Sequence, residues 1–417
     1  MNARVSTFSL FALGVNGIVG VGIFFTPNLL AALVPGTQSA LVFLVTAGLL
    51  LPIAITFAVL GRSLPVDGGP YVWARAAFGD GAAFAVGWVA AVSAILSMAA
   101  VTAGLRDHLA PALGIEAGPP RIAFGCLCVA ALSAVASLGL RPSAFTWDAL
   151  TLLKLLPMLL LLGLALAVPA PASKVVALPA EPSFANWQRA SLLAMFPLQG
   201  FEAVPVLAGS ARRALRGLPV ATIGSLLFAA GLYVAIQLAC VHALPDLASH
   251  DAPLTLAARA LGGSSAGDVV AFGTNLSAIG TAFGMIVVTP RYLAALGNDA
   301  GLGNWLGHYD DRGVPRLALL ATAALVALLA SIQALGSLFA LSSAAVLVQY
   351  AMAIASLLRL AAQGKAPRRA ALPACLGLLA ILLLVKAVEV AELWILGGAL
   401  GLGALFALGR AQARRMP

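Results

Sequence analysis

The sequence predicts an all-α integral membrane protein with about twelve transmembrane helices. Hydrophobic residues make up 61% of the 417 residues and charged residues only 9%, and the mean hydropathy is +1.02. Soluble domains do not have this balance. The apolar runs reach the roughly 20 residues that a helix needs to cross a bilayer. They do not alternate with polar residues, which favours helices over a β-barrel.

Twelve such runs follow one another along the chain, and we number them segments 1 to 12. They cover approximately residues 7–34, 38–61, 82–105, 121–140, 144–168, 188–209, 219–243, 268–290, 315–333, 337–358, 371–388 and 390–409. Little of the chain remains for a domain outside the membrane. The connections 63–80 and 245–266 are the longest with helical character.

The loop charges predict an orientation. If the N-terminus is cytoplasmic, few Lys and Arg lie in outside loops, namely Arg106, Arg121, Lys174, Arg189, Arg259 and Lys386. All the others except Lys154, which lies within segment 5, fall in inside loops. This bias predicts a multi-pass protein of the cell membrane with both termini cytoplasmic. It also explains the net charge of +9 without a nucleic-acid partner.

Segments 1 and 6 each contain a sequence that interrupts a helix. Segment 1 has three glycines in residues 17–22, and glycine in a helix interior costs about 0.8–1 kcal/mol relative to alanine. Segment 6 carries Phe196-Pro197-Leu198-Gln199-Gly200. Broken helices at membrane depth are tolerated only where they face protein or a water-filled cavity, and many secondary transporters bind substrate there.

The two breaks also suggest an internal repeat. Segments 1–5 are followed by segments 6–10 at similar offsets, and the second set begins on the opposite side of the membrane. We therefore expect a five-plus-five inverted repeat, about residues 1–168 and 186–360, within a transporter core of residues 1–360. Residues 361–417 would add two transmembrane helices and a short cytoplasmic tail.

The break in segment 1 is the first candidate binding element. It would free the backbone N–H groups of Gly20, Val21 and Gly22 at the start of a half-helix, where the helix dipole favours an anion such as a substrate carboxylate. The carbonyl of Ile18 would suit a substrate ammonium. Alternatively, the glycines only allow helices to pack closely.

The break in segment 6 would complete the site. The carbonyls of Phe196 and Gln199 beside Gly200 would also suit an ammonium group. The Gln199 side chain could contact substrate or satisfy freed backbone groups. Glu202, just beyond the break, could bind a cationic substrate, take up protons or cap freed N–H groups at the start of the following half-helix.

Lys154 is the most unusual single residue. It lies about 17 Å along segment 5 at 1.5 Å per residue, near the midplane of the bilayer. A lysine there costs about 2.5–3.5 kcal/mol on insertion scales, so it calls for a functional reason. It could exchange a proton, or bond carbonyls at the segment 1 break as a structural residue.

Short motifs in family order resemble the amino acid–polyamine–organocation transporter superfamily. They are Gly20-Val21-Gly22-Ile23-Phe24 with Thr26-Pro27, Leu64-Pro65-Val66-Asp67-Gly68-Gly69-Pro70-Tyr71, Ala77-Phe78-Gly79, Gly87-Trp88, Gly200-Phe201-Glu202, and Arg291 with Leu293-Ala294 before Asn298-Asp299-Ala300-Gly301. Residues 52–55 and 60–62 loosely resemble the small bacterial amino-acid exporter branch. The chain departs from the family at Val21, where serine is common, and at residues 210–215, where the family often has an acidic-Lys-Asn-Pro run.

The resemblance implies the same backbone binding of an amino acid. It also implies that Phe196 is an aromatic gate over the substrate, the alternative being a packing phenylalanine. It further implies that Lys154 couples transport to protons in place of a sodium ion.

We therefore expect a proton-coupled secondary transporter that moves neutral, zwitterionic amino acids by alternating access, without cofactor or metal. The alternatives are a cationic amino acid or polyamine carrier or exchanger and, from another class, a channel or membrane sensor. An enzyme is not expected: the chain has no H-E-x-x-H motif, and its four histidines lie in or beside loops. The substrate, the direction of transport and the oligomeric state stay open.

Overall fold

The computed structural model describes residues 7–66, 68–139, 144–169, 181–206, 216–300 and 305–413, and within these ranges it contains helices and no strand. The helices are α1 (Thr7–Ile18), α2 (Gly22–Phe25), α3 (Pro27–Leu33), α4 (Gln38–Ser63), α5 (Pro70–Phe78), α6 (Asp80–Ala112), α7 (Pro119–Ser137), α8 (Ala144–Ala167), α9 (Phe184–Leu198), α10 (Ala203–Val206), α11 (Leu218–Ala243), α12 (Pro253–Ala300), α13 (Arg316–Ile332), α14 (Leu335–Ala362), α15 (Ala371–Val385) and α16 (Val390–Ala413), with 3-10 turns η2 (Leu247–Ser249) and η3 (Arg368–Ala370).

Every predicted segment coincides with one or more of these helices. In the described ranges, eight helices are long and apolar enough to span a membrane, and the bent stretch from Leu10 to Leu33, with an angle of 63°, would make a ninth. The predicted all-α membrane fold is confirmed, whereas the number twelve stays a prediction. The connections expected to be helical contain α5 and the start of α12.

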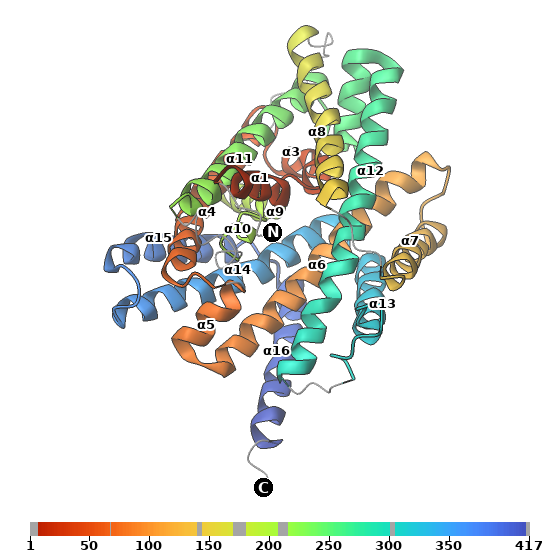
Figure 1. The fold of residues 1–417 in the computed structure, drawn as a ribbon. Coiled ribbons are helices and arrows are strands. Elements are labelled where there is room, and N and C mark those ends of the chain that lie inside the picture. The colour runs from red at the N-terminus through yellow and green to blue at the C-terminus, as the bar shows by residue number, and fades with distance from the viewer. Residues whose placement is uncertain are drawn as a thin grey trace.

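The backbone of α12 turns sharply near its start. Gly263 has a φ of +77°, so the residues before it form a short separate helix and those after it form a long one. Glycine adopts this left-handed conformation without the steric penalty of a side chain. The long part of α12 crosses the bundle beside α6, as Figure 1 shows.

The helix pairs in contact follow a regular pattern. α1 packs along α11 while α9 packs along α4, and α6 packs along α14 while α12 packs along α8. In the numbering of the predicted segments, segment 1 contacts segment 7 as segment 6 contacts segment 2. Likewise, segment 3 contacts segment 10 as segment 8 contacts segment 5. Each second pair follows from the first when a segment of one half is replaced by its counterpart in the other. Two related five-segment halves would produce such matched pairs. The repeat and its boundaries stay predictions.

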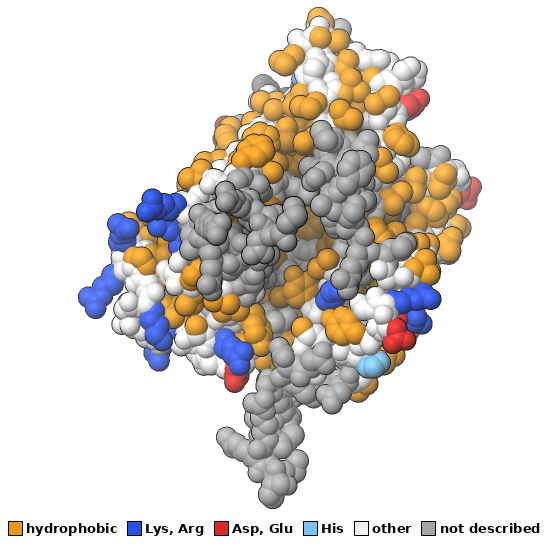
Figure 2. Space-filling model, viewed as in Figure 1, with side chains coloured by type: hydrophobic (Ala, Val, Ile, Leu, Met, Phe, Trp, Pro, Cys, Tyr) orange, Lys and Arg blue, Asp and Glu red, His pale blue; other side chains and the backbone are white. Residues whose placement is uncertain are grey.

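The described surface is mostly apolar. Figure 2 shows hydrophobic side chains over much of it, with Lys and Arg gathered at the lower left, where α14 and α15 lie. Large exposed apolar residues include Leu127, Phe272, Leu379 and Trp394. A surface of this kind is stable in lipid rather than in water. Together with the apolar helices, it identifies a multi-pass membrane protein.

Candidate functional site

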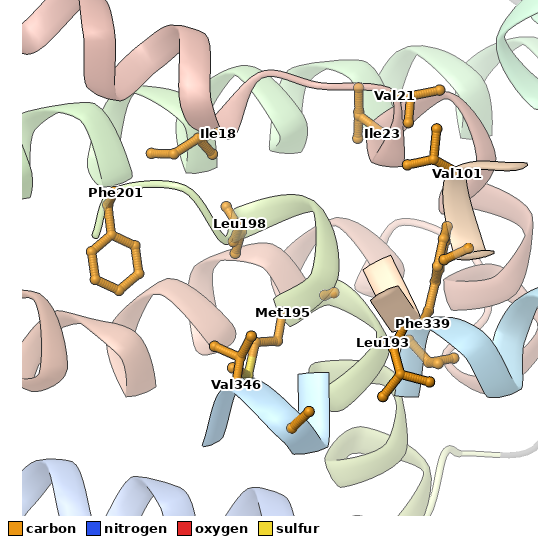
Figure 3. Packing of buried hydrophobic residues seen from close by; sticks show 14 of the residues in the cluster. Ile18, Val21, Ile23, Val101, Leu193, Met195, Leu198, Phe201, Phe339 and Val346 are labelled. Atoms are coloured by element: carbon orange, nitrogen blue, oxygen red, sulfur yellow. The ribbon is translucent and has the colours of Figure 1, made fainter. Parts of the chain in front are cut away.

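The first half of the site is a helix break at the predicted position. α1 ends at Ile18, the chain bends at Val19 and Gly20, and α2 begins at Gly22 with Val21 as its N-cap. Figure 3 shows the non-helical chain between Ile18 and Val21. The first amides of α2 have no preceding helical turn to bond to, and the last carbonyls of α1 have no following turn.

One of these carbonyls has a partner that sequence reasoning missed. The hydroxyl of Tyr233, a fully buried residue of α11, donates to the Ile18 carbonyl at 2.9 Å. The Gly20 backbone N–H faces the same hydroxyl. The Ile18 oxygen, expected to be open to a substrate ammonium, therefore already accepts a hydrogen bond in this conformation. A tyrosine within an apolar segment was the available signal, because a buried hydroxyl needs a partner.

The second break interrupts segment 6 at the predicted position. α9 ends at Leu198, Gln199 is extended, and α10 starts at Ala203. Gly200 has a φ of +120°, a conformation that side chains disfavour. The Gln199 side-chain amide donates to the Ser343 hydroxyl of α14 at 3.3 Å.

The two breaks meet backbone to backbone. A Cβ at Gly200 would lie 2.3 Å from the Gly17 carbonyl oxygen, so no larger residue fits there without movement. A Cβ at Gly22 would lie 3.0 Å from Pro197. Gly20 differs, because the nearest atom to its Cβ would be the Ile18 oxygen at 3.7 Å. Close packing therefore accounts for Gly17, Gly22 and Gly200, but not for Gly20.

Phe196 lies beside the first break and stacks on a second aromatic ring. Its ring centroid is 4.1 Å from that of Phe339 on α14, with 13° between the planes. Its Cδ1 would be 3.2 Å from a Cβ at Gly22. Phe339 is fully buried, and Phe196 is partly exposed. The stacked pair joins α9 to α14 next to the start of α2.

Glu202 lies on the other side of the second break. Its Oε2 accepts the Gly200 backbone N–H at 2.8 Å, so the carboxylate caps part of the interrupted backbone. The hydroxyls of Tyr350 and Tyr292 are close enough to interact with it.

A second aromatic group packs around Tyr350. The ring of Phe57 contacts Trp73 and Tyr350, each with centroids 5.3 Å apart, and Phe201 lies 5.7 Å from Tyr350. All four residues are fully buried. Phe339 and Tyr350 both belong to α14, and eleven residues at 1.5 Å each place them about 16 Å apart. In Figure 3, Phe201 and Phe339 lie on opposite sides of Leu198.

Lys154 belongs to α8, and its side chain lies outside the described part of the structure. Its partners are therefore not assigned. α8 packs against α12 and α11, and α11 is the helix that carries Tyr233. The residues that the structure brings together are thus those of the two breaks and Glu202.

The family model described as "Amino acid permease" matches residues 5–398. The chain is 26% identical to the branched-chain amino acid permease BcaP of Bacillus subtilis over 318 residues, which cover 72% of this chain and 68% of that protein. It is 28% identical to an uncharacterized transporter of Mycobacterium tuberculosis over 416 residues, which cover 97% of this chain and 90% of that protein. It is also 28% identical to human cationic amino acid transporter 4, covering 71% of this chain and 49% of that one.

These matches confirm the resemblance seen in the short motifs, and they identify a transporter rather than an enzyme. They agree with the apolar helical fold and with the paired helix breaks at its centre. The chain belongs to the amino acid permease family and is a multi-pass membrane transporter of amino acids.

Proposed function

We propose that this permease carries neutral, zwitterionic amino acids by proton-coupled alternating access. The observation that carries the proposal is the loose packing at Gly20 in the first break, where an added Cβ would meet only the Ile18 oxygen at 3.7 Å, while Gly17, Gly22 and Gly200 pack tightly. The Gly20 N–H faces the Tyr233 hydroxyl in this conformation. In the proposal a substrate carboxylate takes the place of that contact, near the start of a half-helix where the dipole favours an anion. The Ile18 carbonyl accepts from Tyr233 and the Phe196 carbonyl accepts from the Gln199 N–H, and in the proposal the second lone pair of each oxygen binds the substrate ammonium.

The two aromatic groups support a gated path. Phe196 and Phe339 form one group and the cluster around Tyr350 the other, about 16 Å apart along α14. In Figure 3, Ile18 and Leu198, which end the helices before the two breaks, lie between Phe201 of one group and Phe339 of the other. An amino acid fits within such a distance, and moving either group would open one side of the site. Phe196 is the movable gate in this proposal because it is only partly buried.

The charges favour a neutral substrate. Among the described residues at the two breaks, Glu202 is the acidic side chain, and it already accepts the Gly200 N–H. A second positive charge on the substrate would need a carboxylate free to pair with it. The branched-chain permease among the relatives agrees with this choice. The match to a cationic amino acid transporter keeps cationic amino acids as the second candidate.

The proposal places the protein in the cell membrane with both termini in the cytoplasm, and organises residues 1–360 as the inverted repeat. Lys154 is its proton-coupling residue. A midplane lysine that is charged in one arrangement and neutral in the other would give protons unequal affinity for the two states, which coupling requires.

The test is transport in proteoliposomes with a panel of radiolabelled amino acids, each measured with and without a pH gradient. We expect uptake of neutral amino acids, stimulated by the gradient and independent of sodium. Uptake restricted to arginine, lysine or polyamines would refute the neutral substrate class. A strict requirement for sodium would refute proton coupling.

A further inference from the structure

A cavity of about 370 Å³ lies away from the helix breaks, where α6 ends, α7 begins and α13 ends. These three helices pack on one another at the right of Figure 1. None of the break residues lines the cavity. Its polar lining residues are Arg106, Asp107, Arg121, Ser331 and Gln333, and its apolar lining includes Ile122 and Ile332.

The two arginines in this cavity differ in their partners. Arg106 has partners at each nitrogen: its Nε and Nη2 donate to the two carboxylate oxygens of Asp107 at 2.7 and 2.9 Å, and its Nη1 donates to the Ala330 carbonyl. The Arg106–Asp107 pair is therefore neutral. Arg121 has a buried Nε with no hydrogen-bond partner, and its guanidinium makes no ion pair with any described residue. The lining residues thus carry one uncompensated positive charge.

The buried Nε of Arg121 is unfavourable as long as no acceptor occupies the space next to it, and an anion in the cavity would supply both an acceptor and the compensating charge. Arg121 lies in the first turn of the 19-residue helix α7, where the helix dipole adds to the positive potential. The planar guanidinium binds phosphate oxygens through two parallel hydrogen bonds. The Gln333 amide is a second donor group that lines the cavity. A single negative charge would make the cavity neutral.

The surroundings indicate the source of the anion. The cavity is open at the ends of apolar helices, and its lining includes the exposed apolar residues Ile122 and Ile332. The ends of membrane-spanning helices lie at the depth of the lipid headgroups, and the acyl chains occupy the hydrocarbon core between the two headgroup layers.

We propose that this cavity binds the phosphodiester of a membrane phospholipid, with Arg121 as the main ligand and Gln333 as a second donor. The acyl chains then lie along the exposed side of α7. This lipid site is distinct from the substrate site, and it ties together the ends of α6, α7 and α13. The proposal does not depend on which amino acid is transported.

Native mass spectrometry of the full-length, delipidated protein tests the site. Phosphatidylglycerol is titrated against wild type and three variants. We expect Arg121→Gln to weaken binding of the tightest lipid by about ten-fold or more, as the loss of charge-assisted hydrogen bonds predicts. Arg259→Gln is the matched control, since Arg259 is exposed and pairs with Asp268 away from the cavity. Asp107→Asn should tighten binding, because it leaves the charge of Arg106 uncompensated.

The control arms separate the possible outcomes. Inorganic phosphate at millimolar concentration should not raise the melting temperature of the delipidated protein, while phosphatidylglycerol should. A rise with inorganic phosphate alone would make the ligand a soluble anion and overturn the lipid assignment. Equal lipid binding by wild type and Arg121→Gln would overturn the site. If Arg121→Gln does not fold, Arg121→Lys takes its place. It keeps the charge but loses the two parallel hydrogen bonds, so it should weaken lipid binding, and binding equal to wild type in that variant would overturn the site.

Discussion

At the scale of single residues, glycines that look alike in the sequence have different surroundings. Gly20→Ala should fold normally, because the added Cβ meets no atom closer than 3.7 Å, but it should weaken substrate binding by filling the space for a carboxylate. Gly200→Ala should fail to fold or lose several kcal/mol, because its Cβ would lie 2.3 Å from a backbone oxygen at a φ of +120°. Size-exclusion profiles and substrate-induced thermal shifts measure both effects. An undiminished substrate-induced shift in folded Gly20→Ala, and then in Gly20→Leu, would contradict the carboxylate site.

A second prediction at this scale concerns the stacked rings. Phe196→Ala should weaken substrate affinity and increase passive leak, because the ring both covers the first break and packs on Phe339. The aromatic contact contributes about 0.5–1.5 kcal/mol beyond burial, so the two single alanine variants and the double variant should be non-additive in stability. Transport assays and melting curves of the three proteins check this. Unchanged transport in Phe196→Ala would make the residue a packing residue only.

The sequence locates the breaks but not their partners, for a physical reason. Glycine and proline act on the local backbone, so the interruptions near Gly20 and Gly200 can be found without tertiary information. The Tyr233–Ile18 hydrogen bond joins residues 215 positions apart, and the Gln199–Ser343 bond joins residues 144 apart. Any of many buried hydroxyls could have made such contacts, and only the packing of α11 and α14 selects these two.

At the scale of helices, the two C-terminal helices hold α9 at the end remote from its break. Arg189 of α9 donates to both carboxylate oxygens of Glu392 on α16, at 2.7 and 2.6 Å, and to the Ala387 carbonyl. Sequence reasoning counted Arg189 only as a loop cation, because an isolated arginine gives no signal of its partner. α15 and α16 therefore contact the transporter core directly, through the same helix that carries Phe196.

The Arg189–Glu392 pair gives a prediction about stability. The two side chains are 17% and 3% exposed, so Glu392→Gln should destabilise the protein by roughly 3 kcal/mol, since it leaves a buried guanidinium without its main partner. Glu389 also contacts Arg189, at 3.1 Å, but is 64% exposed, and Glu389→Gln should cost less than about 1 kcal/mol. Thermal unfolding in the same detergent compares the two. Equal losses would show that burial does not decide the strength of this contact.

At the scale of the whole molecule, the structure combines tightly packed breaks with two aromatic groups at different levels of α14. The all-α fold could be predicted because apolar runs of this length have few other stable structures. The functional state could not be predicted in this way. Whether the Ile18 carbonyl faces substrate or accepts from Tyr233 depends on how α1 sits against α11, and alternating access changes such interhelix contacts.

Coupling between protons and transport belongs to this scale, because it needs two arrangements of the entire bundle. Lys154→Ala should remove the response of uptake to a pH gradient and preserve exchange of substrate for substrate across proteoliposomes. In the proposal the lysine gives protons unequal affinity for the two arrangements, and without it substrate could still drive the interconversion. Substrate-induced thermal stabilisation must persist in the variant, which shows that the binding site is intact. Proton-driven uptake equal to wild type in such a folded variant would exclude Lys154 as the coupling residue. The role would then pass to another buried ionisable group, and Glu202, beside the second break, is the candidate.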